Sequence, residues 1–218
     1  SLITVLNLPS QNTTTFRHQY KNGKREQWMI SRSENISADH VPIDWRHCPL
    51  ILLAPVADEL PLSMSDMFPG ALLGISPQGW LRRWDTDGYI RPRMWPNISL
   101  PPNSLVVVSK DDLLGEILPL SWASDRTHVV NTYGPLGAYI HYQDREWHVP
   151  PFPAKVTNTT GAGDIFTTAY LVRYSETMDI NSAGIFASSA ASLSVEKSGI
   201  DSASNRAVIK NESRHTAI

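Results

Sequence analysis

The sequence predicts an α/β protein with a small β element near its amino end. Three short apolar runs, each bounded by proline, glycine or serine, have the pattern of buried parallel strands: LILLAPV (50–56), ALLGIS (71–76) and SLVVVS (104–109). The last third of the chain has longer apolar, alanine-rich stretches that are typical of helices. Strands that alternate with helical stretches indicate an α/β sheet.

Turn signals place the elements of the first half. Residues 13–31 are predicted to form two strands around Asn22-Gly23, a dipeptide that favours a tight hairpin. A short helix is predicted between the first two apolar strands, over residues 57–68. Residues 77–102 are rich in proline and tryptophan and show no clear period, so we predict a loop or an irregular cap there.

The second half begins with a helix signal directly after the third strand. Ser109, with Asp112 three residues later, has the pattern of a capping box at the start of a helix over residues 109–120. The remaining predicted elements are a strand at 128–132, a hairpin at 138–150 and helices at 163–174 and 181–195.

The composition is that of an ordinary globular chain. Its 218 residues can bury one good-sized core, or one core and a small appendage. A formal net charge of −2 argues against nucleic-acid binding through bulk electrostatics, and the absence of a long apolar run predicts no transmembrane helix. The one cysteine, Cys48, excludes a disulfide scaffold and favours a reducing compartment, so we expect a cytoplasmic protein.

The most informative motif is Thr159-Thr160-Gly161-Ala162-Gly163-Asp164-Ile165-Phe166. A glycine turn that leads into a helix presents backbone N–H groups at the positive end of the helix dipole, which favours an anion such as phosphate. An acid directly after the turn can accept a proton from a hydroxyl group beside that phosphate. The motif therefore indicates phosphoryl transfer to an alcohol.

This motif resembles the signature of the PfkB/ribokinase family of small-molecule kinases, D-T-x-G-A-G-D followed by Phe. Four further segments resemble that family in its usual order, over about residues 11–207: the lid strands (13–27), the strand before its N-x-x-E motif (104–113), the T-x-G-x-x-G turn that binds ATP phosphates (129–140) and the small-residue helix that closes the nucleotide pocket (183–200). The resemblance implies a ribokinase-like three-layer α/β/α sandwich with a small β lid, here N-terminally truncated. We expect a lid-like element and lead-in over residues 1–45, and a nucleotide-binding kinase core over residues 46–218.

The resemblance also implies residue roles. Asp164 is expected to be the general base, and the backbone N–H groups of Gly161, Ala162 and Gly163 are expected to form the anion hole. Thr132, Gly134 and Gly137 are expected to line the ATP phosphates. Asp112 stands where the family's Glu helps to organise Mg²⁺ through water; the alternative is a simple helix-capping acid.

Three departures from the family pattern qualify these expectations. Ser109 replaces the usual Asn of N-x-x-E, which alters the magnesium network. Asn158 replaces an Asp that contributes to a monovalent-cation site in several family members, which puts a potassium requirement in doubt. The sequence also starts just before the lid-like segment, without the acceptor-binding residues with which family members usually begin.

One further stretch resembles the subgroup that includes plant and archaeal inositol kinases. Its P-V-x-x-E and Q-G-x-x-R patterns suggest Glu59, Gln78 and Arg82 as substrate residues; the alternative is a turn at Gln78-Gly79 and a surface charge at Arg82. The predicted function is ATP-dependent phosphorylation of a hydroxyl group on a sugar or cyclic polyol, with ATP and a small polyhydroxylated substrate as partners. A homodimer through the lid sheet is expected by analogy. Two alternatives are a nucleotide-binding but catalytically silent remnant of such a kinase and a tryptophan-rich carbohydrate-binding β protein.

Overall fold

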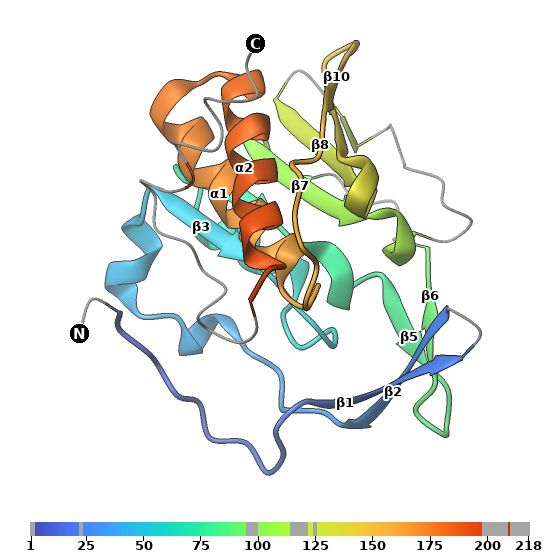
Figure 1. Cartoon of the computed structure of the whole chain (residues 1–218). Coiled ribbons are helices and arrows are strands. Elements are labelled where there is room, and N and C mark those ends of the chain that lie inside the picture. Colours follow the sequence, from blue (N-terminus) through green and yellow to red (C-terminus); the bar gives the residue numbers. More distant parts are fainter. Residues whose placement is uncertain are drawn as a thin grey trace.

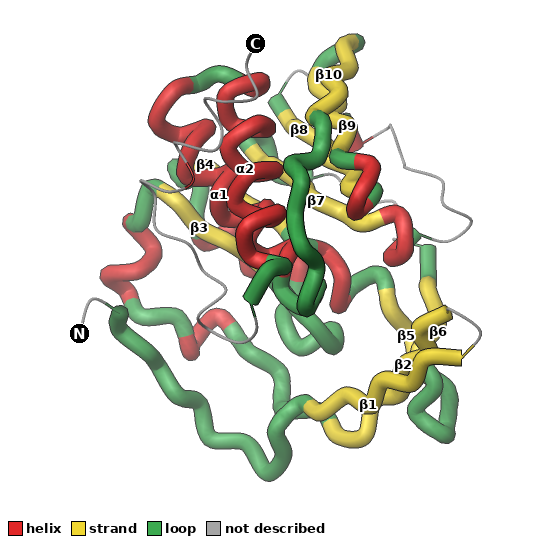
Figure 2. Tube along the Cα trace, viewed as in Figure 1, coloured by secondary structure: helices red, strands yellow, loops and turns green. Residues whose placement is uncertain are grey.

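The computed structural model describes residues 3–21, 24–94, 100–113, 122–123, 126–197 and 209. Its centre is a six-stranded mixed sheet in the order β10-β9-β8-β7-β4-β3 (Figures 1 and 2). The strands are β3 (Leu50–Leu53), β4 (Leu72–Ile75), β7 (Ser104–Ser109), β8 (Thr127–Thr132), β9 (Ala138–Tyr142) and β10 (Arg145–Val149). The first four of these run parallel, and β9 and β10 continue the sheet as an antiparallel hairpin.

Two α-helices cover one face of the sheet, and the 3-10 helix η3 (Leu62–Met67) packs on the other. The helices α1 (Ala162–Thr177) and α2 (Ile180–Ser194) lie together in front of the strands in Figure 1. On the opposite face, Met64 of η3 belongs to the core cluster that includes Val106 and Val108. The other 3-10 helices of the described residues are η1 (Ala38–His40), η2 (Ile43–His47), η4 (Pro77–Gly79), η5 (Lys110–Asp112) and η8 (Gly134–Leu136). The predicted helix over 57–68 is the 3-10 helix η3, because a six-residue segment that starts after Pro61 is too short to favour an α-helix.

Strand β7 shows why this sheet needs two covered faces. Its residues Leu105 and Val107 pack beneath the α-helices against Leu171, whereas Val106 and Val108 belong to the core cluster on the opposite face. Since successive side chains of a strand point to opposite faces, an apolar run with no alternation is buried on both sides. The prediction of buried parallel strands is therefore confirmed for β3, β4 and β7.

A second β layer lies away from the α-helices. Strands β1 (Thr15–Lys21) and β2 (Lys24–Ser31) form the predicted antiparallel hairpin; its tip, Asn22-Gly23, lies outside the described residues. Strands β5 (Arg82–Trp84) and β6 (Ile90–Pro92) form another hairpin, which lies beside the first one in Figure 1. The prediction of an irregular segment over 77–102 was wrong at this place, because three-residue strands are too short to show a period.

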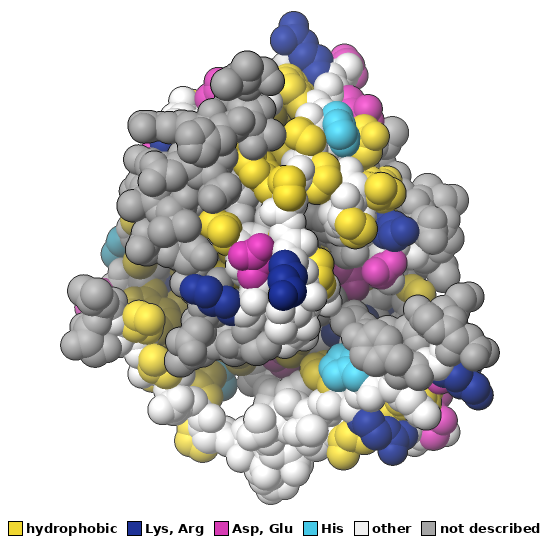
Figure 3. Space-filling model, viewed as in Figure 1, with side chains coloured by type: hydrophobic (Ala, Val, Ile, Leu, Met, Phe, Trp, Pro, Cys, Tyr) yellow, Lys and Arg dark blue, Asp and Glu magenta, His cyan; other side chains and the backbone are white. Residues whose placement is uncertain are grey.

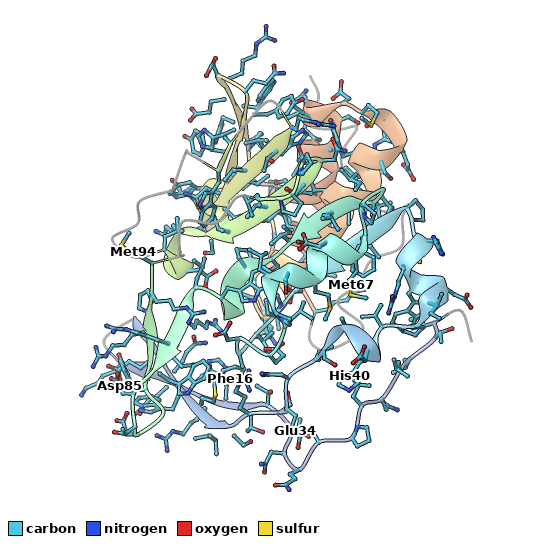
Figure 4. All side chains as sticks on the ribbon, turned by 180° about the vertical axis from the view of Figure 1, so that it is seen from behind. Phe16, Glu34, His40, Met67, Asp85 and Met94 are labelled. Carbon is cyan, nitrogen blue, oxygen red and sulfur yellow. The ribbon has the colours of Figure 1, made fainter. Side chains whose placement is uncertain are left out.

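Backbone and ring contacts join the two hairpins. The Met29 N–H donates to the Gly88 carbonyl at 2.9 Å, and the Trp28 and Tyr89 rings meet edge to face with centroids 5.2 Å apart. Figure 4 labels Phe16 on the first hairpin and Asp85 in the turn of the second.

The helix predicted over 109–120 is only partly described. It begins as the 3-10 helix Lys110–Asp112, and residues 114–121 lie outside the described residues. The Ser109 hydroxyl accepts from the Asp111 N–H at 3.3 Å, so Ser109 does cap this turn.

The described surface adds two observations. No helix in the part of the chain that the structure describes is long and apolar enough to cross a membrane. On the face shown in Figure 3, the described Lys and Arg side chains are scattered among acidic and apolar ones.

Candidate active site

The predicted site residues lie around the carboxyl edge of the parallel strands. Gln78 follows β4, Asp112 follows β7 and Thr132 ends β8. Crevices at the carboxyl ends of strands are where open α/β sheets bind ligands. The sheet order therefore brings together polar residues that are far apart in the sequence.

The glycine turn has part of the geometry that the motif predicts, because the Ala162 N–H, one of the three predicted donors, donates instead to the Thr159 carbonyl at 3.3 Å. Gly161 caps α1 with φ 83°, a left-handed conformation that favours glycine. A Cβ added at Gly161 or Gly163 would meet nothing within 4 Å, so the space above the turn is open. Among the described residues, the N–H groups of Gly163 and Asp164 have no acceptor. Open N–H groups at a helix start can receive an anion.

Asn158 supports the approach to this turn. Its side-chain oxygen accepts from the Thr160 N–H at 2.9 Å. The N–H groups of Thr157 and Asn158 donate to the Val195 carbonyl, just beyond α2, at 2.7 and 3.0 Å. The residue that departs from the family pattern thus has a clear structural role here.

Asp164 lies in the first turn of α1 and keeps access to solvent. Its pKa is raised, first because the surrounding chain removes water from the carboxylate and second because of the negative charge of Asp112. The two predicted acids therefore interact electrostatically, although they lie on different elements. A raised pKa brings a carboxylate closer to the value that suits a general base.

Asp112 has two partners that sequence analysis had assigned to the substrate. Gln78 Nε2 donates to Asp112 Oδ1 at 3.0 Å, and a guanidinium nitrogen of Arg82 lies 4.0 Å from the same oxygen. Arg82 is only 8% exposed, so it is not the surface charge of the alternative reading. Gln78 does lie in a turn, the 3-10 helix Pro77–Gly79, and its side chain reaches Asp112 from there.

Glu59 holds a loop. Its two carboxylate oxygens accept from the N–H of Val56 at 3.0 and 3.2 Å, and one of them accepts from the N–H of Ala57 at 2.7 Å. The same loop presents the Val56 carbonyl to Arg82 at 3.4 Å. Glu59 therefore positions Arg82 indirectly, and its direct contact with a substrate stays a prediction.

Sequence analysis did not single out Phe16. The Arg82 guanidinium lies over the Phe16 ring, 5.7 Å from its centroid. Through Arg82 the first hairpin therefore reaches Asp112, which forms the acidic cluster together with Asp164. The T-x-F pattern of the lid strands was the available signal, but it gives no partner for the aromatic ring.

The turn after β8 is shaped by two glycines. Gly134 has φ 57° and Gly137 has φ 89°, and a Cβ at Gly137 would lie 2.2 Å from the Val149 carbonyl oxygen. The Thr132 hydroxyl donates to the Val108 carbonyl at 3.3 Å. Among the described residues, no hydrogen bond or ion pair joins this turn to Asp112 or Asp164.

The acids do not form a metal cage. Within the described ranges, no group of three or more His, Cys, Asp or Glu side chains could hold a metal ion by itself. Asp112 and Asp164 are close enough for one charge to raise the other's pKa. A divalent cation held by water and ligand phosphates would relieve that repulsion, so the pair fits a cation that arrives with its ligand.

Solved structures define the class of fold. The chain resembles a pyrophosphate-dependent myo-inositol-1 kinase that was converted into a myo-inositol-3 kinase, with a TM-score of 0.75 and 18% identity. That likeness covers 98% of this chain and 77% of the other. The predicted ribokinase-like α/β fold is therefore confirmed.

Sequence comparisons give the family. Residues 116–207 match the family model described as pfkB family carbohydrate kinase. A ribokinase of Bacillus subtilis (strain 168) is 44% identical over 64 residues, which cover 29% of this chain and 22% of the relative. An inositol 3-kinase of Arabidopsis thaliana is 38% identical over 71 residues, which cover 33% of this chain and 20% of the relative. The matched part thus spans about a fifth of the length of these curated relatives, and the predicted family resemblance is confirmed.

Proposed function

We propose that the protein catalyses ATP-dependent phosphorylation of a hydroxyl group on a sugar or cyclic polyol. The observation that carries this proposal is the open glycine turn at the start of α1, next to an Asp164 whose pKa is raised beside a second acid. An anion site beside a base is the minimum that phosphoryl transfer to an alcohol requires. The pfkB match over residues 116–207 includes this turn.

Each part of the site has a role in the proposed reaction. Asp164 takes the proton of the acceptor hydroxyl as its oxygen bonds to the γ-phosphorus, and the bond from that phosphorus to ADP breaks. The open N–H groups of the turn, those of Gly163 and Asp164, receive the charge on the transferred phosphoryl group. Thr132, Gly134 and Gly137 line the phosphates of the nucleotide. Mg²⁺, when it arrives with ATP, supplies charge neutralisation, and Asp112 orients its water shell.

The acceptor is proposed to lie between the acidic cluster and the first hairpin. Gln78 and Arg82 bring an amide and a guanidinium to Asp112 there, and Phe16 brings an aromatic ring from the first hairpin. Ring faces and hydrogen-bond donors together suit a cyclic polyol, which has C–H faces and hydroxyl edges. In this proposal residues 1–45 form the lid and residues 46–218 form the core.

The test is an ADP-release assay with Mg·ATP across sugars, inositols and nucleosides. We expect acceptor-stimulated turnover, and we expect Asp164→Asn to lower it by a factor of about 10² to 10⁴, because the base is removed while the shape is kept. Asp111→Asn is the matched control, since Asp111 is an exposed acid one residue from Asp112. A parallel arm with pyrophosphate in place of ATP tests the identity of the donor.

The outcomes separate the proposed enzyme from its alternative. ATP binding with no turnover on any acceptor would contradict the proposal and support a nucleotide-binding, silent remnant. Turnover that survives Asp164→Asn would show that another group is the base. Turnover with pyrophosphate alone would overturn the assignment of ATP as donor.

A further inference from the structure

A cavity lies at the opposite edge of the sheet from Asp112 and Asp164. Its volume is about 560 Å³, and its lining includes Leu50, Leu72, Leu105 and His128. These four residues are the first or second residues of β3, β4, β7 and β8, so the cavity opens at the amino ends of the parallel strands. Its volume is within the usual range for small-molecule sites.

The last turns of α1 close one side of this cavity. Tyr174 and Ser175 of α1, and Met178 just after it, belong to the lining. The 16 residues of α1 span about 24 Å at 1.5 Å per residue, from Asp164 in its first turn to this cavity at its last. The cavity is thus separate from the site where we place the phosphoryl transfer.

His128 is the buried polar residue in the cavity wall. It is 4% exposed, and its ring lies between those of Tyr142 and Tyr174, with centroid distances of 4.2 and 4.5 Å. Burial lowers the pKa of His128 to about 4, so the imidazole is neutral at pH 7. No part of the proposed reaction uses this residue.

The hydrogen bonds of His128 define its tautomer. Its Nδ1 lies 3.1 Å from the hydroxyl of Tyr170, and burial raises the pKa of that hydroxyl, so it stays protonated. Tyr170 is fully buried, and Nδ1 is the partner that the described residues give its O–H, so the hydroxyl donates to Nδ1. Nε2 then carries the imidazole proton. Within the described residues this N–H has no acceptor.

The lining selects the chemistry of a ligand. Three leucines and two tyrosine rings of the lining favour an apolar, ring-shaped body, and Asn103, Ser104 and Ser175 add polar groups. The Nε2–H of His128 can donate to an acceptor oxygen of a ligand in the cavity. Arg126 is the one lining residue with a full charge. We propose that this cavity binds a small apolar molecule that carries a carboxylate or carbonyl oxygen, with that oxygen accepting from His128.

Benzoate and benzamide are suitable probes, and benzylamine is the matched cation without an acceptor. Titration calorimetry on the whole chain should give a Kd of about 1 mM or below for the two acceptor-bearing probes, a range open to ligands of about nine non-hydrogen atoms. Benzylamine should not bind. A ¹⁵N spectrum of the imidazole should show the Nε2–H tautomer and a shift of its signal on addition of benzoate.

Substitutions at two positions test where the probe binds, and they do not share the same risk of misfolding. Gly70 lines the cavity at an exposed position, and a Cβ there meets nothing within 4 Å, so Gly70→Leu adds apolar bulk at the cavity rim and should weaken binding, whereas Gly70→Ala should leave it. His128→Phe keeps the ring and removes the donor, and it should weaken binding about fivefold to tenfold.

The proposal is wrong if neither acceptor-bearing probe binds, or if benzylamine binds as well as benzoate does. It is also wrong if Gly70→Leu leaves the affinity for benzoate unchanged. Should His128→Phe fail to fold, the Gly70 pair still decides the location, and the ¹⁵N spectrum of the unaltered chain still decides the role of His128.

Discussion

The two edges of one sheet place ionisable groups in opposite settings. At the carboxyl edge, Asp112 and Asp164 keep negative charges within reach of each other, and Gln78 and Arg82 contact the first of them. At the amino edge, His128 is enclosed by tyrosine rings and stays neutral. Burial opposes charge at both edges, but it raises the pKa of the acid and lowers that of the base.

The two edges differ in the groups that compensate the charge of an ionisable side chain. The carboxyl edge has solvent, backbone N–H groups and a nearby guanidinium, so charge survives there and can take part in chemistry. The amino edge gives His128 one hydroxyl partner and two tyrosine rings, and burial keeps the imidazole uncharged. Three measurements test this contrast between a charged edge and a neutral one.

The largest effect should come from protonation of His128. The unfolded imidazole gains its proton near pH 6.5, whereas the folded one stays neutral until about pH 4. The unfolded chain therefore binds more protons between these values, and the stabilisation present above pH 6.5 is lost as the pH falls towards 4. The shift from 6.5 to about 4 corresponds to up to about 3 kcal/mol at 1.36 kcal/mol per unit.

Urea unfolding of the unaltered chain and of His128→Phe, between pH 7 and pH 4, measures the contribution of His128 protonation to the free energy of unfolding. The difference in unfolding free energy between the two proteins should shrink as the pH falls. A difference that stays constant would mean that His128 can take up its proton inside the folded protein.

A smaller loss should follow removal of the buried guanidinium. Arg82→Met keeps the length of the side chain but leaves Asp112 and the Val56 carbonyl without this donor, at a cost of about 2 kcal/mol. Arg83→Met is the control, because Arg83 is exposed and its loss should change stability by less than about 0.5 kcal/mol. Thermal unfolding of both variants gives the comparison, and equal losses would refute a special role for Arg82.

The smallest effect concerns the coupling of the two acids. Asp112→Asn removes a negative charge that raises the pKa of Asp164, so that pKa should fall. Because the proposed base is active as a carboxylate, the acid limb of the kcat/KM profile should move to lower pH. An acid limb that stays in place, or moves to higher pH, would show that Asp164 does not set it.

Local patterns allowed much of this structure to be predicted. The strands β3, β4 and β7 could be predicted from their apolar runs, because side chains on both faces of these strands pack against apolar clusters. The glycine turn is readable because its φ angle, its open N–H groups and its acid all lie within a few residues. For the same reason Asp164 could be placed at the start of a helix before its surroundings were known.

Contacts between distant segments could not be predicted in the same way. The bond from Gln78 to Asp112 joins residues 34 positions apart, and it depends on the adjacency of β4 and β7. The strands β5 and β6 have three residues each, too few to show alternation. His128 lies in an ordinary apolar strand, and only the packing of α1 shows that the residue borders a cavity.

The union of the two small hairpins has a mechanical consequence. Strand β2 is tied to the turn before β6 through Met29 and Gly88, and β5 begins with Arg82, whose guanidinium also meets Phe16 on β1. Any swing of the first hairpin must therefore carry the second one with it or break these contacts. If a bound substrate moves the first hairpin, Arg82 moves with it through its contact with Phe16. Asp112 then moves as well, because Arg82 contacts it. Closure over the acceptor and alignment of the acids would then occur together.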